Sequence, residues 1–142
     1  MIQLEALTLG YGQQILLDHV SANLDGGGLI ALLGRNGSGK STLLRATAGL
    51  GTIKSGRILL AGKDLAELRP EELARTVSFV TTEKVRIPNL KCRDVVALGR
   101  APYTNWVGRL QPQDREIVAK SLALLDMSAY AERTMDQMSD GE

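Results

Sequence analysis

Two stretches near the start of the chain alternate between apolar and polar residues, which is the pattern of a half-buried β-strand. The first covers residues 2–6, with Ala6 as its last apolar position, and the second covers residues 19–24. Residues 56–61 are predicted to form a further short strand, which Gly62 ends. The chain is therefore expected to begin with small strands that pair in an antiparallel sheet.

Two largely apolar runs have a different pattern, which is typical of strands covered on both faces. Residues 29–33 come just before a glycine-rich segment, and residues 77–80 follow a predicted helix. We expect both runs to be buried strands, and we expect the first to belong to a parallel sheet.

Four segments have helical patterns, and helices dominate the second half of the chain. They cover residues 41–48, 70–74, 93–98 and 112–125. Pro70 and Pro112 fall in first turns, where proline fits a helix well. Val118, Leu122 and Leu125 are predicted to lie on one face of the last helix. Small strands, an α/β core and an α-rich segment follow one another, so the expected fold class is α/β.

Composition narrows the range of functions. The chain has 142 residues, 44% of them hydrophobic and 23% charged, which is ordinary for one soluble globular domain. The net charge of +1 predicts neither nucleic-acid nor membrane-surface binding, and no apolar run reaches the roughly 18 residues of a membrane span. Residues 1–5 lack the features of a signal peptide. Cys92 is the only cysteine and fits a reducing cytoplasm, while His19, the only histidine, cannot build a zinc site.

The strongest chemical signal is the segment GRNGSGKS at residues 34–41. It fits the phosphate-loop pattern G-x-x-x-x-G-K-[ST] at every fixed position and lies between a predicted strand and a predicted helix. Glycines allow such a loop to turn its N–H groups toward an anion, and the following helix adds the positive end of its dipole. The candidate nucleotide-binding residues are Gly34, Arg35, Asn36, Gly37, Ser38, Gly39, Lys40, Ser41 and Thr42.

Three of these residues have distinct predicted roles. Lys40 would reach the β- and γ-phosphates of a nucleoside triphosphate, and the Ser41 hydroxyl would ligate Mg²⁺. Thr42 would hold an oxygen of the α-phosphate. The alternative is a glycine-rich strand-to-helix turn that binds no ligand.

Over nearly its whole length the chain resembles the nucleotide-binding subunit of ATP-binding cassette (ABC) transporters. Tyr11-Gly12 lies where that family carries an aromatic residue that stacks on adenine, and residues 34–42 are its Walker A motif. Residues 138–142, MSDGE, align with its LSGGQ signature and retain Ser139 and Gly141. Residues 94–103 are similar to a helical segment of importers for iron–siderophore, haem and cobalamin.

The resemblance implies an incomplete ABC ATPase domain. Residues 1 to about 82 would hold an antiparallel β subdomain and the P-loop NTPase core, and residues 83–142 would begin an α-helical subdomain. It also implies ATP and Mg²⁺ as ligands, with ATP held between two copies of the subunit by Lys40 of one copy and by Ser139 and Gly141 of the other. Transmembrane permease subunits would meet residues 83–110, which would place the protein at the inner face of the cell membrane.

Departures from the family pattern affect the expected activity. Thr82 stands where the family has a glutamine near Mg²⁺, so Thr82 and the following Glu83 are candidate metal ligands, or loop residues without that role. Asp140 would be repelled by a γ-phosphate unless it points away. No Walker B strand with a catalytic glutamate is found. Its nearest candidate ends at Asp126, which the helical pattern assigns instead to an exposed helix end.

We therefore predict a chain that binds Mg-ATP, contains no catalytic residue and does not hydrolyse ATP alone. Exposed apolar sheet surface would make it self-associate. Three alternatives remain at this stage: a P-loop kinase, a non-transport ABC-type ATPase, and a stand-alone nucleotide-binding module.

Overall fold

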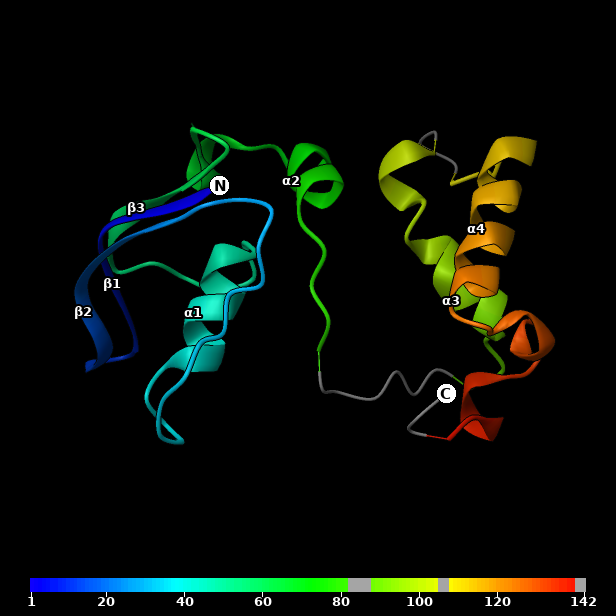
Figure 1. Cartoon of the computed structure of the whole chain (residues 1–142), viewed down its shortest axis with the longest axis horizontal. Coiled ribbons are helices and arrows are strands. Elements are labelled where there is room, and N and C mark those ends of the chain that lie inside the picture. The colour runs from blue at the N-terminus through cyan, green and yellow to red at the C-terminus, as the bar shows by residue number, and fades with distance from the viewer. Residues whose placement is uncertain (82–87, 105–107, 140–142) are drawn as a thin grey trace. The chain divides into compact units, whose positions relative to one another are not determined.

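The computed structural model describes residues 1–81, 88–104 and 108–139 (Figure 1). The chain divides into two compact units, Met1–Phe79 and Val80–Glu142, which are described separately below. The predicted Mg²⁺ ligands Thr82 and Glu83 and the signature residue Gly141 lie outside the described residues. Among the described residues, no helix is long and apolar enough to span a bilayer.

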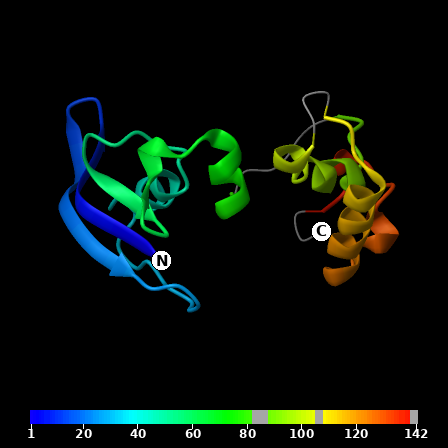
Figure 2. The ribbon, with the colours of Figure 1, turned by 90° about the horizontal axis from the view of Figure 1, so that it is seen from above.

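The first unit is built on a four-stranded antiparallel sheet with the strand order β2-β1-β3-β4. Its strands are β1 (Ile2–Tyr11), β2 (Gln14–Leu24), β3 (Ser55–Leu60) and β4 (Lys63–Asp64). β1 lies between β2 and β3, so both of its edges are hydrogen-bonded (Figure 2). The three longer strands confirm the three predicted strands, although β1 and β2 run further than the alternating pattern indicated.

Irregular pairing in β1 changes which side chains reach the core. The register between β1 and β2 shifts between Leu4 and Leu7, and Ala6 has a left-handed φ of 43°. A bulge of this kind adds one residue and inverts the alternation beyond it. Leu7 is therefore buried instead of Ala6, which is exposed, and the prediction of Ala6 on the apolar face was wrong.

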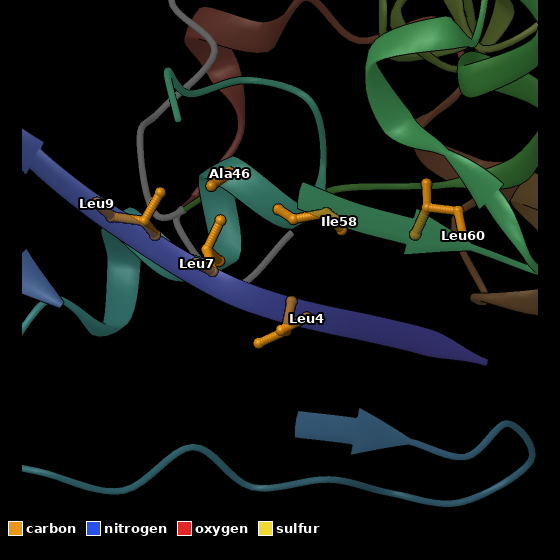
Figure 3. Close-up of a cluster of buried hydrophobic side chains, with 6 residues drawn as sticks. All are labelled: Leu4, Leu7, Leu9, Ala46, Ile58 and Leu60. Carbon is orange, nitrogen blue, oxygen red and sulfur yellow. The ribbon is translucent and has the colours of Figure 1, made fainter. Parts of the chain in front are cut away.

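The core of the first unit joins the sheet to a helix. α1 (Lys40–Thr47) contributes Ala46, which lies with Leu7 of β1 and Ile58 of β3 in Figure 3. Each of these three side chains is completely buried. The remaining buried members of the cluster are Leu4, Leu9 and Leu60. This packing fixes α1, and with it the loop that precedes the helix, against the central strand.

Two short elements complete the first unit. A 3₁₀ turn at Leu65–Glu67 follows β4, and α2 (Pro70–Thr76) begins with Pro70 in its first turn. The Glu72 carboxylate accepts a hydrogen bond from the Arg69 backbone N–H, which closes the helix start and lowers the pKa of Glu72. The helix predicted from Pro70 is confirmed and extends to Thr76.

The two apolar runs expected as buried strands are not strands. Neither residues 29–33 nor residues 77–80 join the sheet, and Leu29 and Leu33 are 100% and 88% exposed. A strand is stabilised by hydrogen bonds to a neighbouring strand and by cover on its faces. Within the part of the chain that the structure describes, no strand pairs with either run, so their apolar sequence is not enough to make them strands.

The second unit is helical. Its described residues form the α-helices α3 (Cys92–Leu98) and α4 (Pro112–Leu124), with 3₁₀ turns at Ala101–Tyr103, Ser128–Tyr130 and Met135–Gln137. Cys92 of α3 packs with Val118 and Leu122 of α4 in a second buried cluster. Burial raises the pKa of the Cys92 thiol, so this cysteine is a core residue without an activated thiolate.

The start and the end of α4 have clear local causes. Asp114 accepts a hydrogen bond of 2.9 Å from the Gln111 N–H and a second from Arg100 Nε, also at 2.9 Å. Both contacts lower the pKa of the Asp114 carboxyl, and the backbone hydrogen bond from Gln111 has the larger effect. At the other end, Met127 N–H donates to the Leu122 carbonyl at 2.8 Å, while Asp126 adopts a left-handed φ of 56°.

This C-terminal turn corrects one prediction and supports another. Leu125 was expected on the buried face with Val118 and Leu122, but it is exposed because the helix has ended at Leu124. Asp126 is an exposed residue after a helix. It therefore does not end a strand, as a Walker B aspartate would.

Candidate functional site

The glycine-rich loop turns through left-handed conformations just before α1. Gly37 has a φ of 80° and Gly39 a φ of 90°, a region that residues with a Cβ rarely adopt. The Ser38 N–H donates to the Arg35 carbonyl at 3.3 Å, and the Leu43 N–H donates to the Gly39 carbonyl at 2.8 Å. The loop thus closes a turn and passes directly into the helix, as the motif predicted.

The N-terminus of α1 is suited to an anion. Gly39 stands at the cap position, and no side chain caps the helix there. The first N–H groups of a helix have no partner within the helix, and the helix dipole adds partial positive charge at the same end. Residues 34–38 and Ser41 are exposed, so a ligand can approach these groups from solvent.

β2 supports the loop from behind. An added Cβ at Gly39 would lie 3.2 Å from Leu17 Cγ and 3.4 Å from Leu16 Cβ. Gly39 is itself buried against these side chains, in contrast to the exposed residues before it. Glycine at this position therefore satisfies both the backbone conformation and the close packing between loop and sheet.

Lys40 folds back over the loop. Its Nζ donates to the Gly34 carbonyl at 2.8 Å and to the Arg35 carbonyl at 2.7 Å. The ammonium therefore lies over the same loop whose N–H groups would face an anion. Lys40 is the first residue of α1, so the positive charge and the positive end of the helix dipole coincide.

Tyr11 meets the same helix from the end of β1. Its hydroxyl lies 3.3 Å from Thr42 Oγ1, and the side chain is 60% exposed. The structure thus brings together Tyr11 and Thr42, two residues 31 positions apart that had been assigned to the adenine base and to the α-phosphate of one nucleotide. The Tyr11 ring is accessible to a flat partner such as a nucleobase.

A surface cavity of about 490 Å³ lies beside this contact. It is lined by Gly10, Tyr11, Thr42, Arg45, Gly49, Leu50, Gly51 and Thr52. The sequence motif did not indicate Arg45 or Thr52. Arg45 follows Thr42 by three positions on α1, and this i, i+3 spacing on a helix was the available signal.

The described residues offer few ligands for a metal ion. No group of three or more histidine, cysteine, aspartate or glutamate side chains is placed to hold one among residues 1–81, 88–104 and 108–139. Ser41 presents an exposed hydroxyl immediately after Lys40, and a hydroxyl is a suitable oxygen ligand for Mg²⁺. The site therefore fits an ion whose other ligands come from phosphate and water.

The lone histidine has a local role only. His19 Nδ1 lies 2.7 Å from Asp18 Oδ1, and both side chains are exposed. Asp18 also accepts a hydrogen bond from the buried Thr8 hydroxyl at 3.2 Å, next to the bulged part of β1. These contacts link β2 to β1.

The signature segment lies in the second unit. Ser139 is exposed, while its neighbour Met138 packs against the cluster around Cys92, Val118 and Leu122. Glu132 is held by Lys91 at 2.7 Å and by Arg93, and these bonds lower the pKa of the Glu132 carboxyl. Met138 therefore anchors the described part of the signature segment by apolar packing, while Ser139 is accessible to solvent.

Comparison with known proteins gives a consistent result. A family model for the ABC transporter matches residues 17–142. An uncharacterized ABC transporter ATP-binding protein of Methanocaldococcus jannaschii is 37% identical over all of this chain and 49% of its own length. A probable siderophore transport system ATP-binding protein of Bacillus subtilis is 33% identical over 99% of this chain and 51% of its own length. The chain thus spans about half the length of these curated relatives.

Solved structures agree with the fold. An ATP-binding subunit of an ABC transporter matches with a TM-score of 0.80 at 26% identity, over 99% of this chain and 56% of that one. A dimeric bacterial ABC transporter cassette matches with a TM-score of 0.79 at 26% identity, over 99% of this chain and 64% of that one. The phosphate loop, the sheet behind it and these matches together establish that the chain belongs to the ABC transporter family.

Proposed function

We propose that this chain is the ATP-binding, energy-coupling part of an ABC importer for an iron chelate. The observation that carries the proposal is the loop at residues 34–40, with two left-handed glycines, an uncapped helix start and the Lys40 ammonium in one place. This is a combination of donors that suits a polyphosphate. It favours a ligand-binding loop over a glycine-rich turn without a ligand.

The residues have separate roles in holding Mg-ATP. The loop N–H groups from Gly34 to Gly39 bind phosphate oxygens, and Lys40 moves from its two loop carbonyls to the β- and γ-phosphates. Thr42 binds the α-phosphate, and the Tyr11 ring stacks on the base. Ser41 ligates Mg²⁺, which would neutralise charge that builds up on the phosphates.

The transported substrate is proposed from relatives. Proteins similar to this chain include a probable siderophore transport system ATP-binding protein and an iron(3+)-hydroxamate import ATP-binding protein of Bacillus subtilis, and a petrobactin import ATP-binding protein of Bacillus anthracis. The substrates named for these relatives favour an iron chelate over haem or cobalamin. The same reasoning supports a second copy of the subunit and transmembrane permease subunits as partners at the inner face of the membrane.

We also infer that this chain binds ATP without hydrolysing it. Four acidic side chains of the first unit have other partners: Glu5 with Arg57, Asp18 with Thr8 and His19, Asp64 with the Ala66 N–H, and Glu72 with Arg69. None of them is placed at the phosphate loop by these contacts. A general base that polarises the attacking water would have to come from another residue.

The test is a calorimetric titration of the purified chain with Mg-ATP. Wild type is expected to give heat that saturates and returns to baseline. Lys40→Ala should weaken binding by about tenfold or more, because a charge-assisted contact to phosphate is lost. Lys63→Ala, an exposed lysine of β4 in the same unit, is the matched control and should bind like wild type.

Two results would contradict the proposal. Equal affinity of wild type and Lys40→Ala would remove the phosphate loop from nucleotide binding. Sustained heat flow with release of inorganic phosphate, absent in Lys40→Ala, would show turnover and would overturn the inference that this chain only binds ATP.

A further inference from the structure

The tip of the hairpin between β1 and β2 carries Tyr11. The last pair of the two strands is Tyr11 with Gln14, so only two residues form the turn. Gly12 has a left-handed φ of 52°, as tight two-residue hairpin turns require. On its other side Gly10 is closed in by β2, because an added Cβ would lie 2.0 Å from the Gln14 carbonyl oxygen. The backbone on both sides of Tyr11 is thus tightly specified.

β3 does not pair with this tip. The register between β1 and β3 ends at Thr8 with Ser55, so Leu9 to Tyr11 extend beyond the last β3 pair. A two-stranded tip of this kind is weakly held without further support. The position of the Tyr11 ring therefore depends on contacts made from outside the sheet ladder.

Lys54 supplies such a contact. Its backbone N–H donates to the Thr8 carbonyl at 3.0 Å, which fixes Lys54 at the point where β3 leaves β1. Its Nζ then donates to the Gly12 carbonyl at 2.5 Å. One residue therefore joins the end of the β1–β3 ladder to the turn that follows Tyr11, across 42 positions of sequence.

Tyr11 is consequently held from two directions. Its hydroxyl meets Thr42 of α1, and the carbonyl of the next residue meets the Lys54 ammonium. A ring fixed in advance loses less freedom when a planar ligand stacks on it than a mobile ring does. The gain applies to ligands that carry a base, because only a planar group can stack on the Tyr11 ring.

We propose that Lys54 is a positioning residue that holds Tyr11 ready to stack on the base of a bound nucleotide. The inference rests on the proposed binding of ATP at the phosphate loop and extends it to the base. No motif of the phosphate loop contains Lys54, which is an exposed lysine in a connecting segment.

The experiment compares two ligands, Mg-ATP and Mg-tripolyphosphate, by calorimetry on the full chain. Lys54→Met should weaken ATP binding about fivefold, as expected for loss of one net hydrogen bond, and should leave tripolyphosphate binding unchanged. Lys54→Arg should restore ATP binding, because a guanidinium can also donate to the Gly12 carbonyl. Lys63→Met is the matched control and should resemble wild type with both ligands.

A double-mutant cycle with Tyr11→Ala separates positioning from other effects. In the Tyr11→Ala background, Lys54→Met should have no further effect on ATP binding. Three results would each overturn the role of Lys54. Lys54→Met could weaken the binding of ATP and tripolyphosphate equally, it could change the binding of neither, or it could have its full effect on ATP binding in the Tyr11→Ala background. If wild type still binds ATP and tripolyphosphate, any of these results removes the role of Lys54 and leaves the proposed function standing. If wild type binds neither ligand, the proposed function and the role of Lys54 are both removed.

Discussion

Individual residues determine the site through backbone conformation as much as through side-chain chemistry. Gly37 and Gly39 provide the left-handed turns of the loop, and Gly10 allows β1 and β2 to approach closely before the hairpin turn. Each glycine was visible in the sequence, but only those of the phosphate loop belong to a recognisable motif. The requirement at Gly10 depends on a backbone atom of Gln14 that the sequence does not place.

Gly10→Ala is expected to disturb the hairpin tip. The new Cβ would overlap the β2 backbone, which cannot move as easily as a flexible side chain, so the free energy of unfolding should fall by about 1–3 kcal/mol. Because Tyr11 is the next residue, ATP binding should weaken as well. Urea denaturation and calorimetry measure the two effects.

Gly28→Ala is the control for this prediction. An added Cβ at Gly28 would meet nothing within 4 Å, and its φ is not left-handed. This variant should retain wild-type stability and affinity. If Gly10→Ala were as stable as Gly28→Ala, the β2 backbone would have moved to accommodate the new Cβ, and the prediction would be wrong.

Elements differ in how well the sequence predicted them, and the difference follows from where their stabilising contacts lie. α2 and α4 begin at prolines and carry capping carboxylates within their first turns, so local sequence specifies them. Residues 29–33 and 77–80 need partner strands from elsewhere, and an apolar pattern cannot reveal whether such partners are present. The bulge at Ala6 is a similar case, because it arises from pairing across β1 and β2.

At α4, Asp114 gives the second unit a dependence on pH. Its pKa is lowered in the folded chain by the Gln111 N–H and then by Arg100. The carboxylate therefore stabilises the fold fully above the ordinary aspartate value of about 3.9, and this contribution disappears as the pH falls through the lower folded value. Thermal melts should show Asp114→Asn less stable than wild type at pH 7, with a difference that narrows toward pH 3.

Asp126→Asn serves as the comparison for the Asp114 variant. Asp126 is also an aspartate of the second unit, but it is exposed and adopts a left-handed conformation that asparagine tolerates. Its melting temperature should follow wild type at every pH. If the difference in melting temperature between wild type and Asp114→Asn stayed constant from pH 7 to pH 3, the ionised Asp114 carboxylate would not be its cause.

On the scale of the whole molecule, each of the two units has its own buried cluster, and apolar side chains remain at the surface of the first. Leu4, Leu7, Leu9, Ala46, Ile58 and Leu60 form one cluster, and Cys92, Val118 and Leu122 form the other. The family resemblance predicted a division near residue 82, and the contacts divide the chain after Phe79. Leu29 and Leu33, which are exposed, belong to the run that the sequence predicted as a buried strand.

This surface is expected to drive self-association. An exposed apolar run with free backbone groups is a template for pairing with another chain. Light scattering should show an apparent mass that rises with protein concentration, and the rise should be smaller for a Leu29→Lys, Leu33→Lys double variant. Substitution of exposed Leu124 and Leu125 in the second unit by lysine provides the control. A constant monomer mass for wild type would contradict the prediction.

The two carbonyl contacts of Lys40 bear on the speed of nucleotide exchange. Before the ammonium can reach a phosphate, its bonds to Gly34 and Arg35 must break, and they can form again when the phosphate departs. The two carbonyls thus offer the ammonium acceptors to return to, so departure of the phosphate does not leave the charge without partners. The same two bonds weaken equilibrium affinity, since part of each new interaction replaces an old one. A lysine of this kind is therefore expected to favour release of a bound phosphate group over tight retention.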